Sequence, residues 1–287
     1  MKLIIQPEAG VAPIVQAIRG AKKSLSIAIF RFDRSEIEKA LATAVARGVA
    51  VQALIAHTNR GGESRLRKLE LRLLEAGVTV TRTADDLLRY HGKYIVADEI
   101  LHVFGFNFTK LDIDRSRSFG ISTRDKRSVQ EALKLFQADV SRQTYQASRS
   151  NLVVSPETSR EQLSRFLKGA KKELAIYDPK ISDSAMIKIL KERVGKNVRV
   201  RVIGDLKGPD GDIEVRRLKS IRVHVRAIIR DGTRAFVGSQ SLRKEELGSR
   251  REVGLLINNP TVTRRLMQVF ESDWNDAAAK SDDAQAA

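Results

Sequence analysis

The chain has 287 residues, of which 42% are hydrophobic, and its formal net charge is +17 at pH 7. This apolar content suffices for a sizeable core and excludes global disorder. The absence of cysteine excludes disulfides, thiolate zinc sites and cysteine nucleophiles. The excess of 52 lysines and arginines over 35 acidic residues favours nucleic acid, an anionic membrane or a phosphorylated substrate as partner, or else only a basic hydrated surface.

No segment has the apolar length of a secretory signal or a membrane-spanning helix. The N-terminal run MKLIIQPEAG soon reaches polar residues and proline, and nowhere do 18 apolar residues follow one another. We therefore expect a cytoplasmic protein without a transmembrane segment. Residues 277–287, rich in alanine and charge, are expected to form a frayed or flexible tail.

Short β-branched runs alternate with segments of helical period. In chain order, the first half is predicted to contain strands at 25–30, 49–55, 78–81 and 94–96, and helices at 35–47, 62–77 and 128–146. This alternation is typical of an α/β fold with a sheet flanked by helices. The helix at 128–146 should close the first half, and NLVVS within the following hand-over segment is a candidate strand of the second half.

The chain contains an internal repeat. GAKKSL at 20–25 returns as GAKKEL 149 residues later, and HGKYIVAD at 91–98 returns as HVRAIIRD 133 residues later. The shorter second offset assigns 16 extra residues to the first half, where they fit the helical stretch 62–77. Two copies of one β/α unit are the simplest explanation. We predict two similar lobes, 1–148 and 149–276.

Histidine is scarce, and two of the four histidines open the same pattern, His-x-(Lys/Arg)-x4-Asp. Chance predicts fewer than about 0.1 matches to this pattern in a chain of this composition. The two matches also occupy corresponding points of the repeat. They are His91, Lys93 and Asp98 in the first half, and His224, Arg226 and Asp231 in the second.

The spacing of the first pattern has a physical logic. On a strand, His91 and Lys93 would point to the same face because they are two residues apart. A neutral imidazole there can attack phosphorus while the ammonium holds phosphate oxygens. Asp98 has an odd spacing and would face the other way, so we expect a turn or salt-bridging role for it and for Asp231.

HGKYIVAD resembles the signature of the phospholipase D superfamily, and the resemblance extends over both halves of the chain. It implies two phospholipase D-like lobes related by a pseudo-twofold axis, with one active site at their interface. It implies that one histidine forms a covalent phosphohistidine and that the other protonates the leaving alcohol. It also implies that neither a metal nor a cofactor is needed.

Further residues match the family pattern in part. GFNFT at 105–109 resembles the family's Gly-Ser-x-Asn segment with one residue missing, and Asn107 matches the asparagine. GSQS at 238–241 keeps the glycine and Ser239 but has Ser241 in place of asparagine. The family's orienting acid is matched by Glu252.

The two motif copies differ, which suits a division of roles. The first half has Ser118 where the second has Glu252, which would leave one histidine with a carboxylate partner. We favour His91 as nucleophile, because its half keeps lysine and asparagine, and His224 as acid and base. The predicted catalytic residues are His91, Lys93, Asn107, His224, Arg226 and Glu252.

The remaining polar candidates receive simpler interpretations. Ser239, Ser241, Arg117 and Arg251 lie in or beside the site segments and are predicted to bind substrate, although solvated arginines are a nearly equal alternative for the last two. His57 and His102 are predicted to be structural, since single histidines are weak evidence for a site.

Three functions remain open. The first is a phospholipase D-type hydrolase of phospholipids, the second a metal-independent nuclease acting on DNA or RNA, and the third a non-catalytic phosphate-binding module. The positive charge favours nucleic acid or an anionic interface, whereas the 5% aromatic content argues against base stacking. We expect a phospholipid substrate, leave peripheral membrane contact open, and expect a monomer because one chain carries both motifs.

Overall fold

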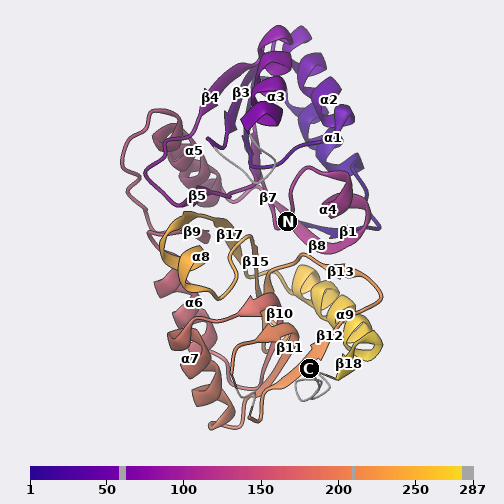
Figure 1. Cartoon of the computed structure of the whole chain (residues 1–287), viewed down its shortest axis with the longest axis vertical. Coiled ribbons are helices and arrows are strands. Elements are labelled where there is room, and N and C mark those ends of the chain that lie inside the picture. Colours follow the sequence, from indigo (N-terminus) through magenta and orange to yellow (C-terminus); the bar gives the residue numbers. More distant parts are fainter. Residues whose placement is uncertain (58–62, 209–210, 280–287) are drawn as a thin grey trace.

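A computed structural model describes residues 1–57, 63–208 and 211–279 (Figure 1). In this part of the chain, two eight-stranded mixed sheets lie one after the other along the long axis, with helices against them. The predicted α/β architecture of two similar lobes is confirmed. No helix in the described ranges is both long and apolar enough to cross a bilayer.

The first lobe is built on a sheet with strand order β1-β8-β7-β6-β2-β3-β4, and β13 also pairs with β8. Its strands are β1 (Lys2–Gln6), β2 (Ser24–Ile29), β3 (Ala50–Ile55), β4 (Thr79–Arg82), β6 (Tyr94–Ala97), β7 (Ile100–Phe104) and β8 (Ser116–Thr123). The helices of this half are α1 (Ala12–Gly20), α2 (Ser35–Ala46), α3 (Glu63–Glu75), α4 (Lys110–Asp114) and α5 (Lys126–Val140).

The second lobe repeats this plan with the order β18-β12-β11-β10-β14-β15-β17-β9. Its strands are β9 (Leu152–Val154), β10 (Glu173–Ile181), β11 (Arg199–Leu206), β12 (Glu214–Arg217), β14 (Ala227–Arg230), β15 (Arg234–Gly238), β17 (Val253–Ile257) and β18 (Ala278–Ala279). Its helices are α6 (Ser159–Lys168), α7 (Ser184–Val194), α8 (Lys244–Gly248) and α9 (Pro260–Asp276).

One hydrophobic core joins the two lobes. Phe119 of β8 packs edge-on against Tyr177 of β10 with ring centroids 5.5 Å apart, and Tyr177 packs in the same way against Phe270 of α9 at 5.2 Å. All three rings are buried. Because burying such a side chain contributes about 1.5–3 kcal/mol, separating the lobes would expose a large apolar surface.

Two short strand pairings also cross the lobe boundary. The second half contributes β13 (Arg222–Val223), which runs parallel to β8 of the first lobe. The first half contributes β5 (Arg89–Tyr90), which pairs in parallel with β16 (Arg250–Arg251). Each pairing comes directly before a motif histidine. The backbone that leads into each histidine is therefore hydrogen-bonded to the opposite lobe.

The repeated aspartates organise a turn in each lobe. Asp98 adopts a φ of 50° and accepts hydrogen bonds from the backbone N–H groups of Lys22, Lys23 and Ser24. Asp231 adopts a φ of 53° and accepts from the corresponding GAKK segment, at Lys171, Lys172 and Glu173. Asp tolerates this left-handed backbone better than most residues. The structure thus gives both aspartates a turn role and links the two repeated motifs.

Most predicted strands lie within one residue of the observed ones, but three expectations need correction. His91 and Lys93 lie between β5 and β6, not within a strand. The helix expected to reach residue 146 ends at Val140, just before Arg142 adopts a φ of 54°. The tail does not begin at Ala277, because that residue is buried and Ala278–Ala279 pair with β12; residues 280–287 lie outside the described ranges. The start of the helix predicted at 62–77 also lies outside them.

Candidate active site

His91 is held by the second lobe through both its ring and its backbone. Its Nδ1 lies 2.7 Å from Oε2 of Glu252, a fully buried carboxylate 161 residues further along the chain. Its backbone N–H donates to the carbonyl of Arg251 at 2.7 Å. Phe30 packs edge-on against the imidazole with ring centroids 4.5 Å apart. These contacts fix the ring orientation and direct Nδ1 away from any substrate.

His224 is held by the first lobe in a related way. Its backbone N–H donates to the carbonyl of Arg117 at 3.1 Å. Its own carbonyl accepts from the Ser118 hydroxyl at 2.8 Å. Ser118, which stands at the repeat position of Glu252, therefore contacts the histidine backbone and not its ring. The two copies share a reciprocal attachment but differ in what faces the imidazole.

A second carboxylate faces His224, which corrects the expectation that only one histidine has an acidic partner. Oδ2 of Asp112, in α4, lies 3.4 Å from Nδ1 of His224. The same carboxylate accepts from the backbone N–H and side-chain Nδ2 of Asn107, at 3.0 and 2.6 Å, and from Arg222. Asp112 is buried, and its contact with His224 is longer and more shared than the one that Glu252 makes with His91.

Sequence reasoning missed Asp112 and its counterpart Glu246. In α8, Glu246 accepts from the backbone N–H of Ser241 at 2.7 Å, as Asp112 accepts from that of Asn107. The two acids are 134 residues apart, the same offset that relates Ser118 to Glu252. Each also follows its Asn107 or Ser241 partner by five residues. Acidic residues at equivalent positions of the two copies were therefore a sequence signal from which Asp112 and Glu246 could have been predicted.

Two buried cations complete the cluster. Lys93 is fully buried, and among the residues that the structure describes its Nζ has no hydrogen-bond partner; the same holds for Nη1 of the buried Arg226. Nε of Arg226 donates to Ser241 at 3.2 Å. Leaving donors of buried cations unpaired is costly, so these atoms are suited to a ligand that brings anionic oxygens.

Burial dominates the electrostatics of the cluster. Burial, reinforced by the charges of Lys93 and Arg226, lowers the pKa of His91 well below its usual value. Burial and Arg226 do the same to the pKa of His224, against the opposing charge of Asp112. Burial also lowers the pKa of Lys93 to about 7, although Glu252 opposes the shift. Since both cations act on both imidazoles, residues from the two lobes form one electrostatic unit with neutral histidines.

The strand register shows where in the chain the one-residue length difference between the two copies lies. Phe104 lies opposite Gly120, and Gly238 lies opposite Gly254, so Phe104 and not Gly105 corresponds to Gly238. The extra residue of the second lobe therefore sits in the turn between β14 and β15, and the GFNFT segment lacks none. Asn107 and Ser241 still correspond to each other.

The serines of the second lobe are engaged within the protein. The hydroxyl of Ser239 donates to the carbonyl of Val253 at 3.3 Å and accepts from its N–H at 3.1 Å. Burial raises the pKa of Glu252, and the interaction with Ser239 opposes this shift. Ser239 thus supports Glu252, and Ser241 supports Arg226, while the predicted direct contact of either serine with substrate stays a prediction.

Comparison with protein families decides which family this fold and site represent. The family model described as "Cardiolipin synthase, PLD-like domain" matches residues 14–140 and 163–274. The chain belongs to this phospholipase D-like family. The two matched segments correspond to the two lobes and include both motif histidines. A comparison with curated proteins finds no match.

Two solved structures share the fold of this PLD-like chain. Polyphosphate kinase from Porphyromonas gingivalis superposes with a TM-score of 0.80 at 18% identity, covering 98% of this chain and 52% of the kinase. Phosphatidylserine synthase from Haemophilus influenzae Rd KW20 superposes with a TM-score of 0.71 at 13% identity, covering 96% of this chain and 85% of the synthase. The PLD-like chain spans about half the length of that kinase. At these identities the likeness shows the fold alone.

The two arginines predicted to bind substrate have structural partners in the PLD-like chain. Arg117 pairs with Asp273 of α9 at 2.8 Å and with Glu8 at 2.7 Å. Arg251, at the equivalent position of the repeat, makes the corresponding contacts. It pairs with Asp139 of α5 at 3.1 Å and with Glu157 at 2.6 Å. Their carbonyls accept the N–H groups of His224 and His91, as described above. Each guanidinium is thus engaged by two carboxylates, which favours a structural role, while the predicted substrate-binding role of the two arginines stays a prediction.

The other two histidines lie apart from this cluster. The side chain of His57 is exposed, and its backbone N–H donates to Thr83. His102 is buried on β7, with Nδ1 at 2.7 Å from the Ser122 hydroxyl.

We predict that Arg251→Met lowers the free energy of unfolding by about 3–5 kcal/mol, because the change leaves the buried carboxylate of Asp139 without its cation and also removes the ion pair with Glu157. Urea unfolding followed by circular dichroism measures the effect. The matched control is Arg265→Met on the exposed side of α9, expected to change stability by less than about 0.5 kcal/mol. An Arg251→Met protein of wild-type stability that only binds substrate more weakly would support the substrate-binding role.

Proposed function

We propose that this chain is a phospholipase D-type phosphodiesterase that cleaves phospholipids through a covalent phosphohistidine. The observation that carries the proposal is the pairing of two neutral imidazoles from opposite lobes with two buried cations that have unpaired donor atoms. A phosphodiester supplies what this arrangement lacks, namely anionic oxygens for the cations and a phosphorus atom open to attack.

His91 is the proposed nucleophile. An ionised Glu252 accepts the Nδ1–H of the ring, and this tautomer leaves a lone pair on Nε2. Nε2 forms a bond to phosphorus while the bond from phosphorus to the leaving oxygen breaks. Lys93 and Arg226 hold the non-bridging oxygens, whose negative charge grows in the transition state. Donors of this kind contribute about 10²–10³-fold each to rate in other enzymes.

His224 is the proposed acid and base. Its looser carboxylate partner, Asp112 at 3.4 Å, suits a ring that changes protonation during the cycle. In the first step His224 takes up a proton as the anionic phosphate of the substrate enters beside it, and gives this proton to the leaving alcohol. In the second step the neutral ring takes a proton from water, the water oxygen bonds to phosphorus, and the bond between phosphorus and His91 breaks. The products are an alcohol and a phosphomonoester.

One feature supports a phospholipid over other phosphodiesters, and a second is compatible with it. The matching family is described by a phospholipid-forming activity, and the net charge of +17 suits an anionic lipid surface. The same charge also favours nucleic acid, so a nuclease is the second candidate. We propose water as the acceptor, a cytoplasmic location with peripheral membrane contact, and a monomer whose site is complete within one chain.

The substrate class is tested by giving the protein phosphatidylglycerol vesicles, phosphatidylcholine vesicles, single-stranded DNA and RNA in parallel, with His91→Asn as control. We expect phosphatidic acid from phosphatidylglycerol, less from phosphatidylcholine and no cleavage of nucleic acid, with all activity lost in the control. Cleavage of DNA or RNA alone would select the nuclease. No turnover of any substrate would select the non-catalytic phosphate-binding module.

The division of roles is tested with bis(p-nitrophenyl) phosphate, whose leaving group needs little protonation. His224→Asn should release about one p-nitrophenolate per protein in a burst and then stall, because attack by His91 survives while water activation does not. Quenching in alkaline denaturant, in which a phosphorus–nitrogen bond survives, and mass mapping should place the p-nitrophenylphosphoryl group on His91. A burst in His91→Asn with the label on His224 would reverse the roles, and no burst in either variant would exclude a covalent intermediate.

The pH dependence follows from the buried lysine. Because burial lowers the pKa of Lys93 to about 7 and the phosphate grip needs its ammonium form, kcat/KM should fall as pH rises above about 7. Lys93→Arg should move this alkaline limb upward by more than about two pH units, since arginine stays charged. The second lobe already has Arg226 at the equivalent position, so the fold accommodates an arginine side chain there. An unchanged limb in Lys93→Arg would assign it to another group.

A further inference from the structure

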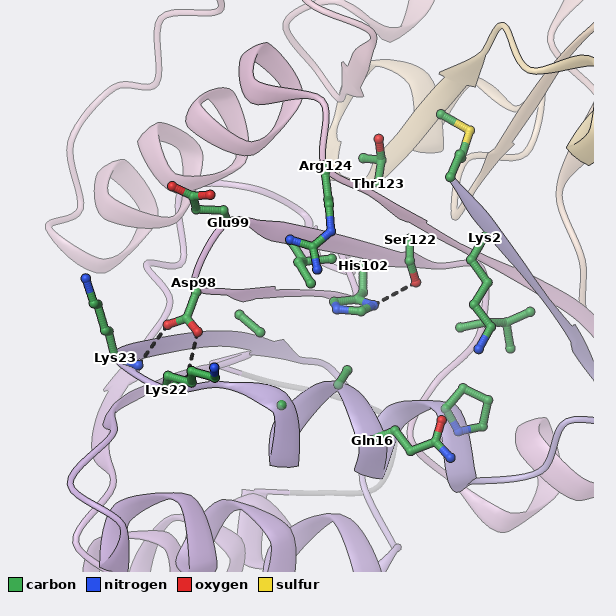
Figure 2. Close-up of a pocket in the computed structure, with 17 residues that line it drawn as sticks. Lys2, Gln16, Lys22, Lys23, Asp98, Glu99, His102, Ser122, Thr123 and Arg124 are labelled. Carbon is green, nitrogen blue, oxygen red and sulfur yellow. Dashed lines mark hydrogen bonds between the residues drawn. The ribbon is translucent and has the colours of Figure 1, made fainter.

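A cavity of about 760 Å³ lies on the outer side of the first lobe, between α1 and strands β1, β6, β7 and β8. Figure 2 shows its polar lining, which includes Lys2, Gln16, Lys22, Lys23, His102 and Arg124. It opens at the end of β6 opposite to the one from which Lys93 and His91 extend. None of the catalytic residues proposed above lines it.

The cavity is strongly basic. Four of its lining side chains are cations, and within the described ranges none of them forms an ion pair. Of its two acidic residues, Asp98 already accepts three backbone N–H groups from the neighbouring turn. Four cations against two carboxylates leave an excess of positive charge around this concave surface, which attracts anions.

A buried histidine stands among these cations. His102 is 7% exposed, and its Nδ1 lies 2.7 Å from the Ser122 hydroxyl. Its Nε2 has no hydrogen-bond partner in the described part of the chain. Figure 2 shows the guanidinium of Arg124 next to the imidazole. When the Ser122 hydroxyl donates to Nδ1, Nε2 carries the proton and offers a further donor to a ligand. Burial, then the charges of Arg124 and Lys2, lower the pKa of His102 to about 4, so the ring is neutral.

The corresponding space in the second lobe is filled. By the repeat and the strand register, Ala17 corresponds to Phe166, and Ala97 to Arg230. The guanidinium of Arg230 lies 4.7 Å from the centroid of the Phe166 ring and donates to the Phe166 carbonyl at 3.0 Å. The small side chains of the two alanines thus leave a cavity in the first lobe. In the second lobe, phenylalanine and arginine fill the equivalent space.

Four polar residues of the lining, His102, Ser122, Lys2 and Arg124, are likewise particular to the first lobe. Register places Phe236 at the position of His102, and Leu256 at that of Ser122. By the repeat offsets, Asn151 and Asn258 stand where the first lobe has Lys2 and Arg124. The fold therefore does not require either the cavity or its charge.

We propose that this cavity is a second anion site, which binds the phosphate group of a phosphorylated ligand. The shared chemistry is a phosphate that receives hydrogen bonds from Arg124, Lys2 and His102. Either a free phosphorylated compound or a phospholipid headgroup supplies it. The site is independent of the proposed catalysis, because its residues neither contact nor replace those around His91 and His224.

The test titrates the full chain with inorganic pyrophosphate at fixed ionic strength and follows the imidazole C–H signals by NMR. With four histidines in the chain, the signal of His102 is assigned by its loss in His102→Gln. We expect the His102 signal to shift with saturation, and calorimetry to give the matching affinity. A parallel arm replaces pyrophosphate by phosphatidic acid vesicles, with phosphatidylcholine vesicles as reference, and tells a headgroup from a free ligand.

Two independent variants locate the site. Lys2→Gln combined with Arg124→Gln removes charge, and Ala17→Phe combined with Ala97→Arg fills the cavity as the second lobe does. Each should weaken binding at least about tenfold. Lys191→Gln, an exposed lysine of the second lobe, removes charge elsewhere and should leave binding unchanged. Thermal unfolding checks that each variant folds.

The proposal is overturned if neither arm shifts the His102 signal. It is also overturned if Lys191→Gln weakens binding as much as the double charge variant, since binding would then follow net charge alone. Retention of binding in a folded Ala17→Phe, Ala97→Arg protein would equally place the anion elsewhere.

Discussion

Reciprocal attachment of each motif histidine to the opposite lobe is the constraint on which the site depends. The N–H of His91 donates to Arg251 and its ring faces Glu252, both from the second half, while His224 is attached to Arg117 and Ser118 of the first. The position of each imidazole is therefore set by residues of both lobes. The shared aromatic core and the strands that cross the boundary hold the lobes in the one arrangement that makes these contacts.

This arrangement keeps unfavourable charges buried. Lys93 and Arg226 are buried with unpaired donor atoms, which costs free energy that the rest of the structure must offset. The offset comes from apolar burial at the lobe interface and from paired charges beneath it, where Arg117 and Arg251 each bind two carboxylates. Unpaired donors that are held rigidly need no reorganisation when a phosphate arrives, which is the electrostatic condition for catalysis.

The two lobes share a backbone plan and differ in side chains where their tasks differ. Glu252 and Ser118 occupy one repeat position, yet the first faces an imidazole ring and the second a backbone carbonyl. Ala97 and Arg230 occupy another, and one leaves a cavity that the other fills. A repeated fold thus supports different chemistry in its two halves because side chains change without disturbing the strand register.

The sequence by itself determined the repeat, most strands and helices, and the two histidine motifs, because these depend on local periodicity and spacing. The turn role of Asp98 also followed, since its position relative to His91 is local. Only the tertiary structure decided which side chains meet across the lobes. It paired Glu252 with His91 of the other half, supplied Asp112 for His224, and gave Arg117 and Arg251 their carboxylate partners. These partners are more than 90 residues apart, and their pairing is set by how two sheets pack, which no local pattern encodes.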